Sequence, residues 1–365
     1  MKYYVLAGEA SGDKQAALLC AAIHRNDADA SIIGWGGEAM EAAGAKVTKH
    51  YRELAYMGFV EVVKHLPAIF RNLKSCKKEI LSYAPDALIL VDYPGFNLRI
   101  AKWAFKHQIP VYYYISPQLW AWHTSRVHGI KKAVRKMYVI LPFEKDFYEQ
   151  YHMQVMYIGH PLAVEIKREN NFIYSPKEKH VALLPGSRKN EVDRILPITA
   201  EMIRMMSDHT FTVAAVSHLS PTIYDQWIGE FDNVEVVMDD MKLALQHSEA
   251  AVVTSGTATL ETALLGVPQI VVYKGTAFSY QIAKRLIKVN YISLVNLIMD
   301  KELIPELIQS ECNPGHMLSQ LKRMMQPDRA AHVKAEYKRL AELLTSGGGA
   351  AAAALDIISD IGLKH

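Results

Sequence analysis

The chain has 365 residues, of which half are hydrophobic and 22% are charged, and its formal net charge is +3. This composition excludes a largely disordered, collagen-like or coiled-coil protein, and the length suggests about two domains. The three cysteines lie far apart without a C-x-x-C pair, which argues against a disulfide framework or a zinc finger and favours a reducing, cytoplasmic location.

Charge and hydropathy restrict the possible partners. Residues 1–160 carry 20 Lys and Arg against 14 Asp and Glu, a net charge of +6, whereas the remaining residues have a net charge of −3. The basic half favours an anionic partner such as phosphate, nucleic acid or a membrane surface, although the excess is modest. No apolar run reaches the ~18–20 residues that span a bilayer. The first residues predict a strand rather than a secretory signal.

Apolar β-rich runs alternate with segments of helical period. In the first half we predict strands at 3–7, 31–36, 86–92, 110–116, 137–142 and 155–159, and helices near 13–25, 60–83, 97–107, 125–135 and 144–151. A polar linker at 167–179 precedes strands at 180–187, 211–217, 234–238, 250–256 and 268–273, helices at 189–206, 221–229, 240–247, 257–265 and 279–288, and a mostly helical tail over 302–363.

This alternation predicts parallel sheets that are covered by helices on both faces. The fold class is therefore α/β, with two doubly wound, Rossmann-like domains. We expect one domain at 1–165, a second at 166–345, and a C-terminal helix at 346–365. Ligands in such folds bind beyond the carboxyl ends of the strands, so the cleft between the domains is the expected site.

The loop after the first strand reads GEASGD and contains Gly8, Glu9, Ser11, Gly12 and Asp13. Its glycines allow a tight turn before a helix. The spacing is not G-x-G-x-x-G, so support for a dinucleotide site is weak. The two acids suit sugar hydroxyls better than phosphate. Alternatively, the loop is an ordinary strand–helix turn in which Asp13 caps a helix.

Asp92 follows the most apolar predicted strand, in the string DYPGFN. A carboxylate at the carboxyl end of a buried strand faces the expected cleft and could take a proton from a hydroxyl nucleophile. The alternative is that Asp92 caps the helix that begins near Asn97. His123 and His160 compete for the role of base, but neither has this strand-end position.

The string SPQLWAWH after the fourth long strand concentrates aromatic and basic side chains. Trp120 could stack on a sugar or line an acyl pocket, and Arg126 could bind a phosphate with two hydrogen bonds. Alternatively, this loop packs under the sheet. The basic residues at 131–136 indicate a solvated face rather than a nucleic-acid site, because no RNA-binding motif accompanies them.

In the second half, the string LLPGSR repeats the strand–glycine–helix pattern. Here Ser187 and Arg188 replace the acids of the first loop, which suits a diphosphate held by N–H groups and a guanidinium. The alternative is that Glu191, three residues further on, neutralises Arg188.

The string SGTATLE forms a second candidate phosphate loop. Ser255, Gly256 and Thr257 open a helix, and Glu261 lies one turn inside it, where it could reach a ribose. Alternatively, Ser255 or Thr257 only caps the helix. Two such loops in one domain favour a nucleotide diphosphate. Further on, the amides of Asn296 and Gln309 could contact a base or sugar.

Several catalytic patterns are absent from the sequence. It contains no G-x-S-x-G and no H-E-x-x-H, and its D-x-D string, Asp27-Ala28-Asp29, lies before a predicted strand and not in a loop after one. Many metal-dependent sugar-nucleotide enzymes use D-x-D acids, but no candidate phosphate loop of this chain has them, so the diphosphate charge is expected to be met by Arg188, helix termini and hydroxyls, without metal or other cofactor.

Taken together, these motifs resemble the lipid-A-disaccharide synthase family. The matching strings occur in order from residue 8 to about 310: GEASGD, MG-F-VEV, DYPGFN, SPQLWAW with Arg126, LPFE, GHPL, LLPGSR and SGTATLE, followed by the stretch from Asn296 to Gln309. One departure is Leu294-Val295-Asn296, where the family often reads L-P-N, and this leaves the role of that loop open.

The resemblance implies an inverting GT-B glycosyltransferase of lipopolysaccharide biosynthesis in Gram-negative bacteria. The family moves 2,3-diacylglucosamine from its UDP conjugate to the 6-hydroxyl of 2,3-diacylglucosamine 1-phosphate, which forms a β-1,6 linkage and releases UDP. It implies no metal, and a peripheral position on the cytoplasmic face of the inner membrane. Asp92 is then the expected base, with the nucleotide in the C-terminal domain and the acceptor in the basic N-terminal one.

Two other functions remain open on the residues alone. One is a UDP-sugar epimerase of similar architecture, which needs no surface for an amphiphile. The other is a non-catalytic nucleotide-sugar binding module. A nucleic-acid-binding protein is least favoured because the C-terminal half is acidic.

The segment from Met57 to Lys78 predicts a membrane contact. Its apolar residues recur at helical spacing with Lys and Arg beside them, which is typical of a helix that lies on an anionic membrane. The alternative is that this face packs on the N-terminal sheet; Pro67 also interrupts the segment. If the helix is buried, residues 131–136 become the alternative membrane contact.

Overall fold

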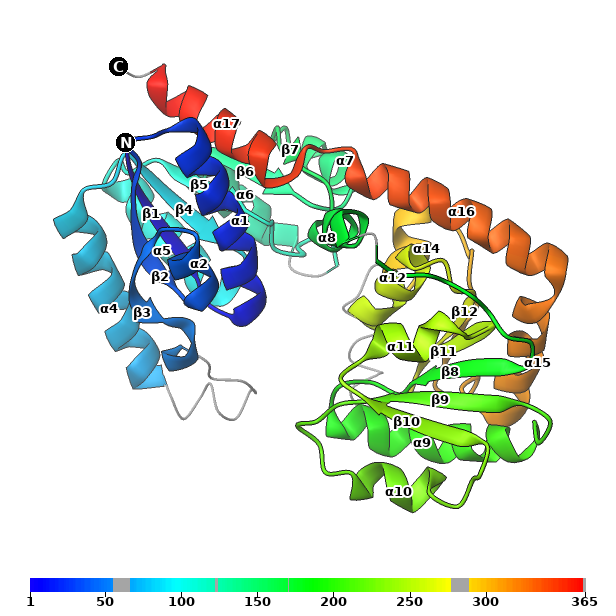
Figure 1. The fold of residues 1–365 in the computed structure, drawn as a ribbon. Coiled ribbons are helices and arrows are strands. Elements are labelled where there is room, and N and C mark those ends of the chain that lie inside the picture. The colour runs from blue at the N-terminus through cyan, green and yellow to red at the C-terminus, as the bar shows by residue number, and fades with distance from the viewer. Residues whose placement is uncertain (55–65, 122–123, 170, 277–288, 364–365) are drawn as a thin grey trace. The chain divides into compact units, whose positions relative to one another are not determined.

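The computed structural model describes residues 1–54, 66–121, 124–169, 171–276 and 289–363. The chain forms two compact units. The first comprises Met1–Pro161 and Leu344–His365, and the second comprises Leu162–Leu343. Each contains one parallel sheet with helices on its faces (Figure 1). The predicted pair of doubly wound α/β domains is thereby confirmed.

The sheet of the first unit has the strand order β3-β2-β1-β4-β5-β6-β7. Its strands are β1 (Lys2–Ala7), β2 (Ser31–Gly36), β3 (Lys46–His50), β4 (Ala87–Val91), β5 (Val111–Tyr114), β6 (Lys136–Val139) and β7 (Met156–Tyr157). β3 was not expected from the sequence, because this edge strand is only partly buried and its KVTKH string lacks an apolar run.

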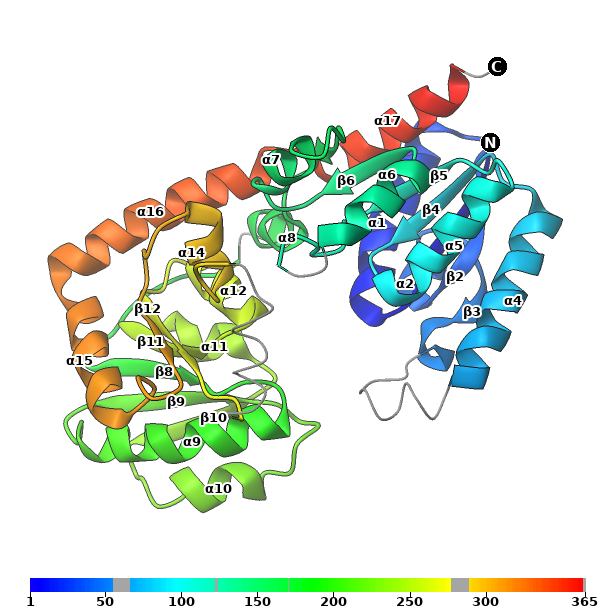
Figure 2. The same ribbon diagram turned by 180° about the vertical axis from the view of Figure 1, so that it is seen from behind.

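Helices of the first unit cover both faces of this sheet (Figure 2). They are α1 (Ala10–Asn26), α2 (Glu38–Ala42), α4 (Leu66–Tyr83), α5 (Pro94–Lys106), α6 (Val127–Ala133), α7 (Glu144–Glu149) and α17 (Gly349–Gly362), with 3-10 turns η1 (Tyr51–Glu53) and η2 (Thr124–Arg126). α1 and α17 pack on one face and α4, α5 and α6 on the other, so the unit has two apolar cores.

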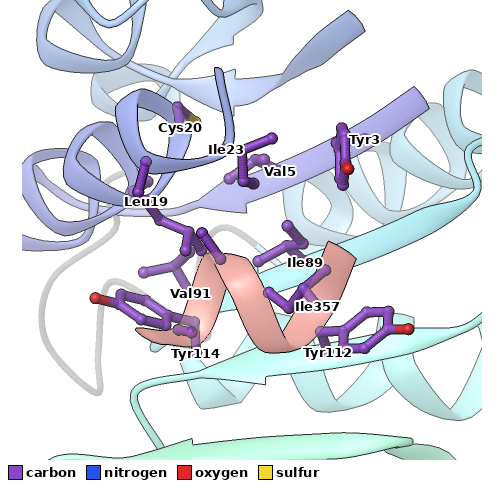
Figure 3. Close-up of a cluster of buried hydrophobic side chains, with 14 of the residues drawn as sticks. Tyr3, Val5, Leu19, Cys20, Ile23, Ile89, Val91, Tyr112, Tyr114 and Ile357 are labelled. Carbon is purple, nitrogen blue, oxygen red and sulfur yellow. The ribbon is translucent and has the colours of Figure 1, made fainter. Parts of the chain in front are cut away.

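The last helix completes one of these cores. Ile357 of α17 lies against the sheet beside Ile89, Tyr112 and Tyr114, as Figure 3 shows. At the rim the Tyr112 hydroxyl donates to Asp360 Oδ2 at 2.7 Å. The C-terminal helix, which the sequence analysis treated as a separate segment, is therefore an integral part of the first unit.

The sheet of the second unit has the order β10-β9-β8-β11-β12-β13. Its strands are β8 (His180–Leu184), β9 (Thr210–Ala215), β10 (Val234–Met238), β11 (Ala250–Thr254), β12 (Gln269–Tyr273) and β13 (Glu306–Ile308). Its helices are α8 (Pro161–Glu169), α9 (Lys189–Arg204), α10 (Thr222–Ile228), α11 (Met241–Gln246), α12 (Thr257–Leu264), α14 (Leu294–Met299), α15 (Pro314–Met325) and α16 (Pro327–Thr345).

Three expectations for this half need comment. The predicted linker at 167–179 begins inside α8, which extends to Glu169. The predicted tail helix starts only at Pro314, where Asn313 caps α15 by accepting the His316 N–H at 3.0 Å; the residues before it contain β13, too short to give a periodic signal. The helix expected at 279–288 lies outside the described residues.

Candidate active site

Each sheet reverses its strand order once, between β1 and β4 in the first unit and between β8 and β11 in the second. In doubly wound folds, ligands bind at this switch point, beyond the carboxyl ends of the strands. The four loops singled out from the sequence follow these four strands. Topology therefore pairs GEASGD with DYPGFN in one unit, and LLPGSR with SGTATLE in the other.

The turn after β4 has an unusual backbone. Asp92 and Tyr93 both have positive φ, 43° and 46°. The Asn97 side chain holds this turn by donating to the carbonyls of Val91 at 3.1 Å and Asp92 at 2.8 Å. The Tyr113 hydroxyl also donates to the Asp92 carbonyl, at 2.7 Å. Two consecutive left-handed residues that are fixed by buried side chains are typical of a functional site.

Gly8 lets the first loop approach this turn. A Cβ atom on Gly8 would lie 2.2 Å from a ring carbon of Tyr93, so no other residue fits without moving that ring. The close approach brings Glu9 near Asp92. Burial, followed by the charge of Glu9, raises the pKa of Asp92 to about 6, whereas a hydrogen bond with the Tyr93 backbone lowers it.

A carboxyl with this pKa is ionised at neutral pH yet basic enough to accept a proton efficiently. The alternative role of Asp92 as helix cap is not observed, because Tyr93 is the N-cap residue of α5 and no side chain caps it. His160 is a weaker candidate base. Burial lowers its pKa to about 4, and its backbone N–H donates to Leu344 O at 2.7 Å. His123 lies outside the described residues.

The other acid of the first loop has a structural role. Asp13 is buried, and its carboxylate accepts the N–H groups of Gly37, Ala39 and Met40 at 2.7, 3.0 and 3.2 Å. It therefore caps α2, which corrects the expectation that this carboxylate faces a sugar. The Ser11 hydroxyl donates to Glu9 Oε1 at 3.0 Å, so Glu9 is the acid of this loop that remains at the surface; Gly12 is buried in the first turn of α1.

The loop with Trp120 rests on a buried carboxyl that sequence reasoning did not single out. Glu144 accepts the backbone N–H groups of Ile140 and Leu141 at 3.1 and 2.9 Å, and the hydroxyl of Ser116. Burial raises the pKa of Glu144 to about 7. The sequence analysis noted its string LPFE only as a family match. The available signal was an acid two residues after the strand predicted at 137–142.

Trp120 is half-buried, with its ring edge-to-face against Phe143 at 4.9 Å between centroids. The alternative in which this loop packs on the unit thus applies in part. Arg126, by contrast, is exposed at the start of α6.

The two candidate phosphate loops of the second unit line one pocket, with a volume of about 520 Å³. It lies at the carboxyl ends of the strands. The predicted residues that line it are Ser187, Arg188, Ser255, Gly256, Thr257 and Glu261. Sequence reasoning missed the opposite wall, which includes Val216, Asp239 and Met241, because the ends of β9 and β10 carry no recognisable motif.

Glu191 occupies the cradle formed by the first of these loops. Its carboxylate accepts the backbone N–H groups of Ser187 and Arg188 at 3.2 and 3.3 Å and pairs with the Arg188 guanidinium at 3.2 Å. The Arg188 side chain is still 82% exposed. Gly186, with φ +115°, supplies the turn that brings Glu191 so close. The neutralisation considered from the sequence is therefore present in this arrangement.

The second loop leaves its helix terminus open. No side chain caps α12, whose N-cap residue is Gly256, and the Ser255 hydroxyl instead donates to Ile292 O at 3.2 Å. A Cβ atom on Gly256 would have no described atom within 4 Å. The first N–H groups of a helix attract anions, so this end suits a phosphate.

Two polar groups complete the pocket wall. The Thr254 hydroxyl is buried and has no hydrogen-bond partner among the described residues. Burial, with Glu165 and Glu169, raises the pKa of the half-buried Glu261, whereas Lys242 lowers it.

Asn296 and Gln309 do not line this pocket. Asn296 is fully buried; its amide donates to Ile304 O and Glu306 Oε1 at 2.8 and 2.9 Å, and accepts the N–H groups of Leu303 and Ile304 at 2.9 and 3.0 Å. This uses the full capacity of an amide, so here Asn296 holds a loop together rather than contacting a base. Gln309 follows β13 with a positive φ of 55°, and its buried Nε2 has no partner among the described residues.

Comparison with known sequences gives a consistent result. A family model described as lipid-A-disaccharide synthetase matches residues 3–353. The chain is 39% identical over 365 residues to the lipid-A-disaccharide synthase of Syntrophus aciditrophicus, covering 96% of this chain and 95% of that protein. To that of Geobacter metallireducens it is 35% identical over 374 residues, covering 99% and 97%.

Solved structures show the fold. A kitacinnamycin glycosyltransferase matches with a TM-score of 0.69 at 13% identity, covering 99% of this chain and 98% of that one. A UDP-GlcNAc 2-epimerase from Neisseria meningitidis, solved with UDP-GlcNAc bound, matches with a TM-score of 0.63 at 12% identity, covering both chains fully. The expected GT-B fold is confirmed.

Proposed function

The chain belongs to the lipid-A-disaccharide synthase family, and from this membership we infer that it is the glycosyltransferase that forms the lipid A disaccharide. The epimerase alternative is not favoured, because the likeness to epimerases concerns the fold only, whereas the family model covers nearly the whole chain. A binding module without catalysis is disfavoured for the same reason.

We propose that the donor is UDP-2,3-diacylglucosamine and the acceptor is 2,3-diacylglucosamine 1-phosphate. The observation that carries this assignment is that two phosphate-suited loops, far apart in sequence, line one pocket in the second unit. The pocket would hold UDP, while the loops around Asp92 in the basic first unit would hold the acceptor. That the substrates meet between the units remains a prediction from the sequence.

The proposed reaction is a direct displacement. The acceptor 6-hydroxyl gives its proton to Asp92 and its oxygen attacks the anomeric carbon of the donor. The bond from that carbon to the diphosphate oxygen breaks, and its electron pair leaves with UDP. The configuration inverts, so the new linkage is β-1,6. The raised pKa of Asp92 suits a base of this kind.

The leaving diphosphate gains one negative charge, which the protein must stabilise. Arg188, the Ser187 loop and the open N-terminus of α12 are the groups placed for this. Glu191 must then yield the N–H groups of Ser187 and Arg188 to a phosphate oxygen. We propose this exchange of carboxylate for phosphate as the first step of donor binding, without a metal ion.

We further propose that the protein acts peripherally on the cytoplasmic face of the inner membrane. Within the described ranges no helix is long and apolar enough to cross a membrane. The start of the predicted membrane segment lies outside the described residues. In the remainder, Leu73 is buried in the core, whereas Phe70 is 64% exposed and Arg71 lies beside it. The alternative in which this helix packs on the sheet therefore applies to Leu73, whereas Phe70 and Arg71 are exposed and support the proposed membrane contact.

The membrane proposal predicts that Phe70→Ser combined with Arg71→Glu reduces sedimentation with phosphatidylglycerol vesicles. Both positions are exposed, so the fold and UDP affinity should be retained. Undiminished vesicle binding by the folded variant would move the contact elsewhere, first to residues 131–136.

The function itself is tested by mixing the purified protein with both substrates. We expect equimolar UDP and disaccharide 1-phosphate. Release of UDP without disaccharide, or interconversion of the donor sugar, would contradict the assigned reaction. UDP binding without any turnover would support the binding-module alternative.

A further inference from the structure

A second cavity lies in the first unit, in the groove between α5 and α6. We call it the α5–α6 groove. Its volume is about 380 Å³, and it begins at Pro94, two residues after Asp92. The mechanism above does not use this groove, and of its lining residues only Pro94, Gly95 and Arg126 belong to the motifs described from the sequence. The groove is part of one unit and does not depend on the other.

The charge of the groove is one-sided. Arg99 and Lys102 of α5 and Arg126 before α6 line it, and no Asp or Glu is among its described lining residues. All three cations are exposed. Arg99 donates one N–H to Gly95 O at 2.9 Å, which fixes its guanidinium along α5 while other N–H groups remain for a ligand. Three cations without a counter-charge fit an anion of high charge density, such as a phosphate monoester.

Apart from Ser125, the remaining lining is apolar, and several of its residues are small. Leu98 contributes an apolar wall, and Gly95 and Gly129 face the space from opposite helices. A Cβ atom added to either glycine would have no described atom within 4 Å, so these glycines keep the groove wide rather than relieve a clash. The groove therefore combines an apolar wall with a cationic rim, which suits an acylated phosphate.

We propose that the α5–α6 groove binds the phosphate end of the lipid acceptor, with the phosphate at Arg99, Lys102 and Arg126 and an acyl chain along Leu98. This inference rests on the proposed function. Arg99 lies about 7.5 Å along the axis of α5 from Pro94, at about 1.5 Å per residue, and Asp92 precedes Pro94 by two residues. A sugar held by its 1-phosphate at Arg99 would thus present its opposite end toward Asp92.

The test compares the double variant Arg99→Ala/Lys102→Ala with the single variant Lys106→Ala as control. Lys106 is an exposed lysine of the same helix that does not line the groove. Binding of the acceptor in detergent micelles is measured directly, without donor. The double variant should bind about ten- to one-hundred-fold more weakly, and its KM for the acceptor should rise while UDP affinity is unchanged. Lys106→Ala should match the parent.

Three further measurements separate recognition of the phosphate from other causes of weak binding. With an acceptor that lacks the 1-phosphate, parent and double variant should bind equally. Gly129→Leu should fill the groove and also weaken acceptor binding, since the site is open to a larger side chain. Lys102→Arg, which keeps the charge, should retain most of the affinity.

Equal acceptor binding by the folded double variant and the parent would overturn the proposal. So would a variant that loses only its binding to phosphatidylglycerol vesicles, because the groove would then be a membrane contact. Failure of the proposed function gives a different result: the parent would not release UDP, yet acceptor binding would still depend on Arg99 and Lys102.

Discussion

Replacing Asp92 with Asn tests its proposed role as catalytic base, because the change should lower turnover and at the same time raise stability. Asn keeps the size of the side chain and tolerates the left-handed backbone at φ 43°, so the turn should survive. It cannot accept the proton of the acceptor hydroxyl. Loss of a general base typically lowers the rate about 10²–10⁴-fold, and UDP affinity should be unchanged.

The same substitution should stabilise the protein above pH 6. The folded state raises the pKa of Asp92 from 3.8 to about 6, so the ionised carboxylate is less favourable there than in the unfolded chain. The difference between a pKa of 3.8 and a pKa of about 6 corresponds to about 3 kcal/mol as an upper value. The folded parent binds the Asp92 proton more tightly than the unfolded chain does. The free energy of unfolding of the parent therefore falls as the pH rises from 3.8 to about 6.

Thermal unfolding at pH 4 and pH 8 measures this difference, and UDP release measures turnover. Asp92→Asn should unfold several degrees above the parent at pH 8, and the difference should be much smaller at pH 4. Asp29→Asn, at an exposed position in the same unit, is the matched control and should change neither property. Near-normal turnover would remove Asp92 from the role of base. An unchanged unfolding temperature at pH 8 would refute the argument from burial.

The remaining predictions concern the second unit and the proposed metal-free mechanism. Arg188→Ala should weaken UDP binding by about 1.5–3 kcal/mol in calorimetry but leave uridine binding unchanged, whereas Glu191→Gln should strengthen UDP binding; effects of the same sign for both would contradict the proposed exchange. Asn296→Ala should destabilise the protein by roughly 3 kcal/mol in urea unfolding, because the buried backbone groups of Leu303 and Ile304 lose hydrogen bonds to its amide; an unchanged midpoint would argue against its structural role. Turnover should persist in EDTA, and recovery only on adding Mg²⁺ would refute the metal-free mechanism.

The sequence predicted the sheets because both faces of each are covered. The string ALILV of β4 is buried throughout, and continuous apolar runs of this kind are distinctive of parallel strands. The edge strands β3 and β13 escaped notice, since edge strands are short and partly exposed. Hydrophobic pattern therefore reports the centre of a sheet better than its margins.

Site residues could be predicted only where polar or glycine-rich strings directly follow a predicted strand. Asp92 and the two candidate phosphate loops lie at such positions. The sequence could not reveal which polar groups the fold itself uses, because Asp13 and Asn296 bond with backbone that lies many residues away or in a following loop. Nor could it reveal the α5–α6 groove, whose cations come from two helices that are adjacent only in space.

The position of α17 has a consequence for biosynthesis. The final helix supplies Ile357 and Ile361 to a core whose side chains from outside this helix all come from the first 158 residues, including Val5 and Ile89. During translation, the ribosome completes the whole second unit before it makes these residues. Until then the part of this sheet face that α17 covers is exposed beside α1 and is a surface for chaperones or aggregation. The half that emerges first is thus the half that finishes folding last.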